Sequence, residues 1–109
     1  MIIFHYIGLF IGGGTLVNAI PHLVNGVSGR PFQTPFAEPP GKGLSSSTLN
    51  VFWGFMNLLS AYLLLIRWSS LQLNSAPEAL TAGLGALMTA LFCARHFGKL
   101  HGGTAPQSP

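Results

Sequence analysis

The stretch LNVFWGFMNLLSAYLLLI, residues 49–66, contains no Asp, Glu, Lys or Arg. Two further stretches share this property, IIFHYIGLFIGGGTLVNAI at 2–20 and ALTAGLGALMTALFCA at 79–94. Every Asp, Glu, Lys and Arg of the chain lies between or beyond these three stretches. A helix needs roughly 20 apolar residues to cross the hydrocarbon core of a bilayer. The sequence therefore predicts an all-α fold, a small polytopic membrane protein with three transmembrane helices.

The boundaries of the three spans follow from their flanking residues. We expect spans at about 2–20, 49–67 and 77–97, joined in a single transmembrane domain that covers 1–98, with a flexible C-terminal tail at 99–109. The hydroxyl cluster before the second span supplies N-cap residues, and Pro near the start of the third suits a first helical turn. The chain is too short for a second domain.

The first and third spans each leave an alternative open. No Lys or Arg precedes the apolar part of the first span, which disfavours a secretory signal peptide, although cleavage after Ala19 remains an alternative. Only sixteen uncharged residues precede Arg95 in the third span, which is short for a crossing. Because this segment is rich in Ala and Gly, we expect it to pack against the other helices rather than face lipid.

The composition excludes several classes of protein. Charged residues make up 6% of the chain and the formal net charge is +3, against about 25% charged residues in soluble proteins. The five basic residues are dispersed, so no basic patch for nucleic acid is expected. Cys93 is the only cysteine, which excludes an intrachain disulfide and favours an ordinary packing role.

The basic residues also predict an orientation. With three spans, only Arg67 lies on one side of the membrane, and the opposite side carries Arg30, Lys42, Arg95 and Lys99. Positive charge is retained in the cytoplasm. We therefore expect a protein integral to a bacterial-type plasma membrane, with the N-terminus outside and the 21–48 loop and the C-terminus cytoplasmic.

The 21–48 loop is long and rich in Pro, Gly and Phe. Pro fixes φ and removes backbone donors, so this segment is expected to be extended, polyproline-like or turning. Connections longer than about 12–15 residues tend to be functional or disordered. Its aromatic residues favour an ordered cap over the bundle or a contact for a partner, with Arg30, Phe32 and Phe36 as the candidate loop contacts. Arg30 is suited to binding an anion or a lipid headgroup, and Glu38 is its alternative partner.

Small residues recur on each span at spacings of three and four, which places them on one helical face. Such residues allow close approach of helices in a membrane. The interior of the bundle is the simplest explanation, and a docking face for another subunit is the alternative. The predicted helix-packing residues are Gly8, Gly12, Gly54, Ala82, Ala86 and Ala90.

Polar residues share these faces and define a candidate polar intramembrane face. An unpaired amide costs several kcal/mol in hydrocarbon, so each should find a partner. By depth, we expect Asn57 to lie opposite the glycine run 12–14 and donate to its carbonyls, and Asn18 to pair with Asn50. Both contacts would hold the first two helices together. The full face comprises His5, Thr15, Asn18, Asn50 and Asn57.

No arrangement typical of an enzyme or a cofactor site is present. The sequence lacks a P-loop, a nucleophile motif and paired carboxylates, and no acidic residue lies within a span. His22 with His96 is the only conceivable pair for haem, and His96 and His101 are five residues apart, which does not place them on one helical face. We therefore predict a non-enzyme with no cofactor and no metal site.

Three functional hypotheses remain, in order of preference. The first is a structural or accessory subunit that self-associates or packs against a larger membrane complex, because three short helices carry more small-residue surface than one bundle needs. The second is an oligomeric small-molecule binding or transport protein with a polar intramembrane cavity. The third is a histidine-ligated haem or metal membrane protein. The expected partners are the lipid bilayer, further copies of the chain or a larger complex, and no nucleic acid.

Overall fold

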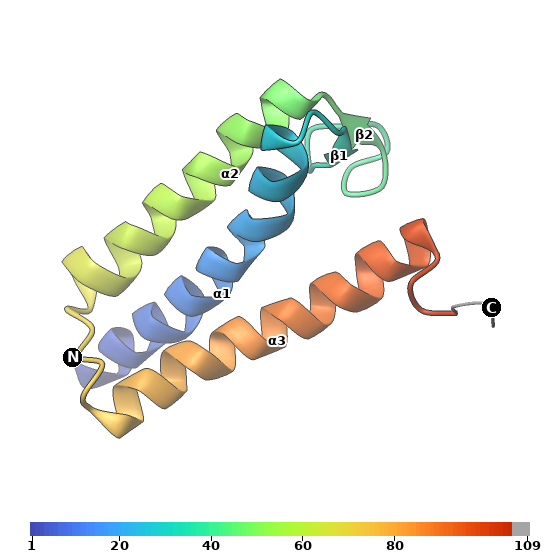
Figure 1. Ribbon diagram of the computed structural model, residues 1–109. Coiled ribbons are helices and arrows are strands. Elements are labelled where there is room, and N and C mark those ends of the chain that lie inside the picture. Colours follow the sequence, from blue (N-terminus) through green and yellow to red (C-terminus); the bar gives the residue numbers. More distant parts are fainter. Residues whose placement is uncertain (106–109) are drawn as a thin grey trace.

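Three long helices form most of the computed structural model, which describes residues 1–105 (Figure 1). Helix α1 covers Ile2–Val27, α2 covers Ser47–Tyr62 and α3 covers Ala76–His101. A π-helical segment, η1 (Leu63–Trp68), continues α2 without a break. All three helical stretches are long and apolar enough to cross a membrane. The three predicted spans are therefore present as helices.

Helix α1 is longer than the sequence indicated. The predicted end near Ile20 rested on Pro21, which lacks a backbone donor and disfavours helix continuation. The helix instead passes through Pro21 and ends at Val27. The Asn25 side chain donates to the Pro21 carbonyl at 2.8 Å within this last part of the helix. The connection to α2 is correspondingly shorter than 21–48.

The connection contains a small sheet, so the fold is not purely helical. Strand β1 (Phe32–Gln33) pairs antiparallel with β2 (Leu44–Ser45), with Phe32 opposite Ser45. The Thr34 and Ser45 hydroxyls share a hydrogen bond of 2.5 Å across this hairpin. Thr34 is 1% exposed. The loop is thus folded and has a buried side, as the alternative of an ordered cap expected, and it contains two short strands that the sequence analysis did not predict.

Helix α3 also extends past its predicted end. We expected the third span to end near residue 97 and the tail to begin at residue 99. The helix continues to His101 and ends at Gly102, whose φ of 83° is a left-handed conformation that suits glycine. The Gly103 N–H then donates to the Gly98 carbonyl at 2.7 Å. Residues 106–109 of the predicted tail lie outside the described part of the chain.

Helix α1 is the central element, because it packs against both α2 and α3 (Figure 1). Its contact with α3 depends on glycine on both sides. A Cβ at Gly13 would collide with the Ala82 carbonyl, and one at Gly85 would collide with the Phe10 carbonyl. In Figure 1 the two helices approach in this region and separate toward the C-terminal end of α3.

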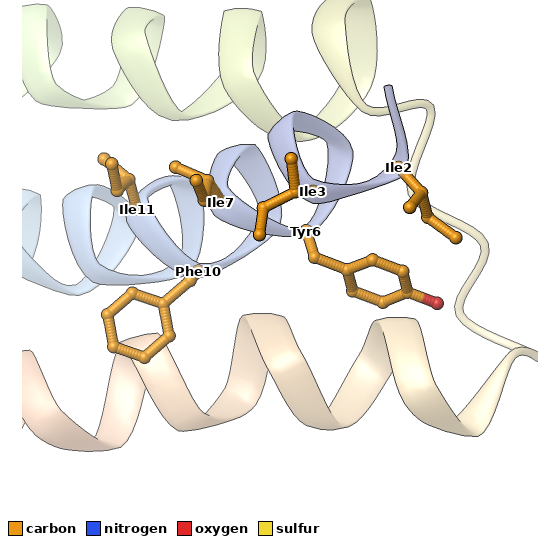
Figure 2. A pocket seen from close by; sticks show the side chains of 6 residues that line it. All are labelled: Ile2, Ile3, Tyr6, Ile7, Phe10 and Ile11. Carbon is orange, nitrogen blue, oxygen red and sulfur yellow. The ribbon is translucent and has the colours of Figure 1, made fainter.

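Much of the surface is apolar. Helix α3 buries only Gly85, and Leu84 and Phe92 on it are 51% and 64% exposed. We expected α3 to pack against the other helices rather than face lipid. This is wrong for most of its surface, because α3 packs against α1, is bonded to the loop through His96 and His101, and leaves most of its residues exposed. An apolar pocket of about 670 Å³ also lies along the N-terminal part of α1, where Figure 2 shows Tyr6 and Phe10 pointing toward α3. A surface of this kind requires lipid or another protein to cover it.

Candidate functional site

Two asparagines join α1 to α2 near the middle of both helices. Asn18 Nδ2 donates to Asn57 Oδ1 at 3.0 Å, and Asn57 Nδ2 donates to the Trp53 carbonyl at 2.9 Å. Asn57 is 7% exposed. The expectation that Asn57 donates to the carbonyls of the glycine run is wrong, because its amide N–H donates to the Trp53 carbonyl and its Oδ1 accepts from Asn18.

Asn18 also contacts the third helix. Cys93 Sγ on α3 lies 3.8 Å from Asn18 Oδ1, within hydrogen-bond range for sulfur. A continuous series of polar contacts therefore crosses from α3 through α1 to α2. This connects all three helices at one level of the bundle, and the sequence had assigned Cys93 a packing role only.

A polar cavity of about 320 Å³ adjoins the asparagine pair, and we call it the mid-helix cleft. Helix α1 forms its floor, Asn57 comes from α2 and Thr89 comes from α3. The cleft is lined by Phe10, Ile11, Gly14, Thr15, Asn18, Asn57 and Thr89. Three of the five residues of the predicted polar face, Thr15, Asn18 and Asn57, are thus brought together.

Hydrogen-bonding groups in the mid-helix cleft are only partly used. An asparagine amide carries two N–H donors, and Asn18 and Asn57 each use one within residues 1–105. The Thr89 hydroxyl makes no hydrogen bond to any described residue, whereas the Thr15 hydroxyl donates to the Ile11 carbonyl at 2.7 Å. The cleft therefore offers two amide N–H groups and a hydroxyl to whatever covers it.

Asn50 belongs to a different part of the molecule. It is fully buried, and its Oδ1 accepts from His22 Nδ1 at 2.8 Å. Its Nδ2 donates to the carbonyls of Phe32, Ser45 and Ser46 at 3.0–3.2 Å. Asn50 thus ties the start of α2 to α1 and to both strands, and the predicted Asn18–Asn50 pair does not form.

His5, the last residue of the predicted polar face, lies at the opposite end of the bundle. Its Nε2 is 3.3 Å from Glu78 Oε2 at the start of α3, and its carbonyl accepts from the Ser69 hydroxyl at 2.9 Å. These contacts fasten the segment between α2 and α3 to the N-terminal turn of α1. His5 therefore takes no part in the mid-helix cleft.

The loop residues have contrasting roles. Phe32 is 7% exposed and packs against Phe97 at 4.6 Å between ring centroids and stacks on His101 at 5.4 Å. Phe36 is 60% exposed. Arg30 is exposed and donates from Nε to Asn25 Oδ1 at 3.1 Å. Of the three predicted loop contacts, Arg30 and Phe36 are available to a partner and Phe32 is interior.

Two histidines attach the loop to α3. His96 Nε2 donates to the Gly41 carbonyl at 2.7 Å, and His101 Nε2 donates to Gln33 Oε1 at 2.9 Å. His22 and His96 both pack edge-on against Phe97. Within residues 1–105 no group of three or more His, Cys, Asp or Glu side chains is arranged to hold a metal ion.

Some of the predicted packing residues contact another helix, and others are exposed. Gly8 lies against Trp68 and Ser69, Gly12 against Leu64 and Leu65, and Gly54 against Leu23, all at distances that leave no room for a Cβ. Ala82 faces Gly13, Ala86 is half-buried and Ala90 is exposed. The small-residue face of α3 is therefore covered by α1 only in its first half.

Sequence reasoning missed two residues that the structure brings into these sites. His22 follows the small and polar face of the first span and was also weighed as a metal or haem ligand, but its pairing with Asn50 was not expected. Thr89 lies within the third span, and a single hydroxyl residue in an apolar span does not by itself predict a functional site. Comparisons of the chain with protein-family models, with curated proteins and with solved structures found no match.

Proposed function

We propose that this chain is an integral membrane protein that serves as a structural or accessory subunit, packing against a second copy of itself or a larger membrane complex. The observation that carries the proposal is the mid-helix cleft, with its two free amide N–H groups and the Thr89 hydroxyl. It lies at the level where three candidate membrane-spanning helices meet.

The cost of leaving the cleft uncovered supports a protein partner. Moving an amide or hydroxyl group into hydrocarbon without a hydrogen bond costs about 4–8 kcal/mol. A helix from a partner can supply carbonyl or side-chain acceptors to Asn18, Asn57 and Thr89, whereas lipid tails cannot.

The expected placement in the cell extends the proposal. The loop and the C-terminal end of α3 lie at one end of the bundle, since His96 and His101 bond to the loop. Arg30, Lys42, Arg95 and Lys99 belong to this end and Arg67 to the other. We expect the four-cation end to be cytoplasmic in a bacterial-type plasma membrane and the N-terminus to be outside.

The experiment that tests the accessory role is mild-detergent affinity capture from the native membrane, followed by native mass spectrometry. We expect a dimer or a stoichiometric unrelated partner. Thr89→Val removes the free hydroxyl of the cleft and should weaken the assembly. Thr81→Val is the matched control, because the Thr81 hydroxyl is satisfied by the Pro77 carbonyl at 2.7 Å. A monomer recovered without a partner would contradict the proposal, as would equal effects of the two variants.

A second candidate function is binding or transport of a small polar molecule by an oligomer. The volume of the mid-helix cleft, about 320 Å³, favours it, because ligand pockets begin at about 300 Å³. Native mass spectrometry separates the two functions, since a homo-oligomer with an additional bound mass would favour the ligand-binding protein. The contacts of the histidines within residues 1–105 do not favour the third hypothesis, a histidine-ligated cofactor. A Soret band in the purified protein would support it.

A further inference from the structure

The loop end of the bundle carries a groove between α1 and α3 that is separate from the mid-helix cleft. It encloses about 390 Å³ where the two helices separate. Val17, Pro21 and Val24 line it from α1, and Ala90, Ala94 and Phe97 line it from α3. We call it the α1–α3 groove. Its lining is almost entirely apolar, so an apolar chain fits it better than a polar solute.

Asn25 is the polar residue of this lining, and it positions Arg30. The Arg30 backbone N–H donates to the Asn25 carbonyl at 2.8 Å, and Arg30 Nε donates to Asn25 Oδ1 at 3.1 Å. Both bonds fix the arginine at the rim of the groove. The two Nη groups have no hydrogen-bond partner within residues 1–105, so part of a guanidinium fork is left free beside an apolar groove.

Among residues 1–105, the charged side chains at this end of the bundle are positive apart from one carboxylate. Arg30, Lys42, Arg95 and Lys99 are exposed and form no ion pair with any described residue. Glu38 is the only acidic residue at this end, and the single ion pair of residues 1–105 joins His5 to Glu78 at the other. Unpaired cations at a membrane surface attract anionic lipid, each contributing about 1 kcal/mol.

We propose that the α1–α3 groove and Arg30 together bind an anionic phospholipid. The acyl chain occupies the groove, and the phosphate oxygens accept hydrogen bonds from the free Nη groups of Arg30, whose N–H fork can reach two oxygens of one phosphate. Exposed Phe36 and Leu44 on the loop lie at the same end, where apolar side chains suit the interfacial region of a bilayer. The inference rests on membrane integration but not on the accessory role.

The test is a lipid titration of the purified, delipidated protein in mild detergent, read by thermal unfolding and by native mass spectrometry. Phosphatidylglycerol should raise the unfolding temperature and leave one bound lipid per chain, and phosphatidylcholine should do neither. Arg30→Gln should weaken phosphatidylglycerol binding about tenfold or more, because tenfold is the lower end of the range for a hydrogen bond to a charged group. Arg67→Gln removes a cation from the opposite end and should leave binding unchanged.

A second variant tests the groove independently of Arg30. Ala94→Leu fills the α1–α3 groove and should reduce lipid binding. Gly83→Leu is the control and should leave lipid binding unchanged, because it adds a side chain on α3 where a Cβ meets nothing within 4 Å. Equal binding of phosphatidylcholine, equal protection by inorganic phosphate, or full binding by both Arg30→Gln and Ala94→Leu would overturn the proposal. Extraction of the protein from membranes by alkaline carbonate would instead contradict membrane integration itself.

Discussion

Asn18 on α1 donates to Asn57 on α2 across a distance of 3.0 Å, and the same Asn18 accepts from Cys93 on α3. One side chain therefore contacts both neighbouring helices at the level of the mid-helix cleft. Replacing Asn18 therefore disturbs its contacts with both helices. To measure the contribution of the Asn18–Asn57 pair alone, Asn57 is the residue to replace.

Asn57→Leu should lower the free energy of unfolding in detergent by about 1 kcal/mol, the usual range of a hydrogen bond between membrane helices. Thermal unfolding of the purified variant measures the change. Ser60→Ala is the control, because the Ser60 hydroxyl donates only to the Met56 carbonyl of its own helix. In a double-mutant cycle with Asn18→Val, most of the stability lost in Asn57→Leu should appear as interaction energy between the two positions. Unchanged stability of Asn57→Leu would contradict a stabilising role for the pair.

Gly13→Ala should lower stability by about 1–3 kcal/mol, because the added Cβ collides with the Ala82 carbonyl and forces α1 and α3 apart. Gly83→Ala on α3 should instead raise stability, by up to about 1 kcal/mol, because its Cβ meets open space and alanine favours a helix. Chemical or thermal unfolding of both variants gives the sign directly. Unchanged or raised stability of Gly13→Ala would mean that the α1–α3 contact is not as close as described, and lowered stability of Gly83→Ala would contradict the open space at that position.

Asn50→Leu should open the loop between α1 and α2. The variant leaves His22 and three backbone carbonyls without their buried amide partner, and one unpaired buried group costs about 1–3 kcal/mol. Cleavage by trypsin after exposed Lys42 should therefore become several-fold faster than in the unaltered protein. Asn74→Leu, at an exposed asparagine between α2 and α3, should cleave at the original rate. Equal rates in all three proteins would show that Asn50 does not hold the loop closed.

The orientation can be tested with single cysteines in a Cys93→Ser background. Asn74→Cys and Lys42→Cys both lie in exposed connecting segments at opposite ends of the bundle. With the loop in the cytoplasm, a membrane-impermeant maleimide added to intact cells should label Asn74→Cys, and Lys42→Cys should react only after the cells are opened. The reverse pattern would invert the topology, and labelling of both in intact cells would contradict three spans.

The sequence alone predicted how many helices there are and where their apolar centres lie. Each of the stretches 2–20, 49–66 and 79–94 excludes charge, and an apolar run of this length forms a helix in which every backbone group is bonded internally. It also placed Thr15 and Asn18 on one face of the first helix and Asn57 on the small-residue face of the second, because helical periodicity fixes which residues share a face of one helix.

Only the tertiary structure decided which of these residues meet. Asn18 pairs with Asn57, seven residues further along α2 than the predicted Asn50, a difference of about 10 Å at helical rise. The error follows from Pro21, since a helix ending there would align differently with α2 than one that continues to Val27. Helical periodicity fixes the faces of one helix and leaves the axial alignment of two helices open. That alignment is set by contacts such as Gly54 with Leu23 and Gly26 with Val51, where missing side chains allow the helices to close.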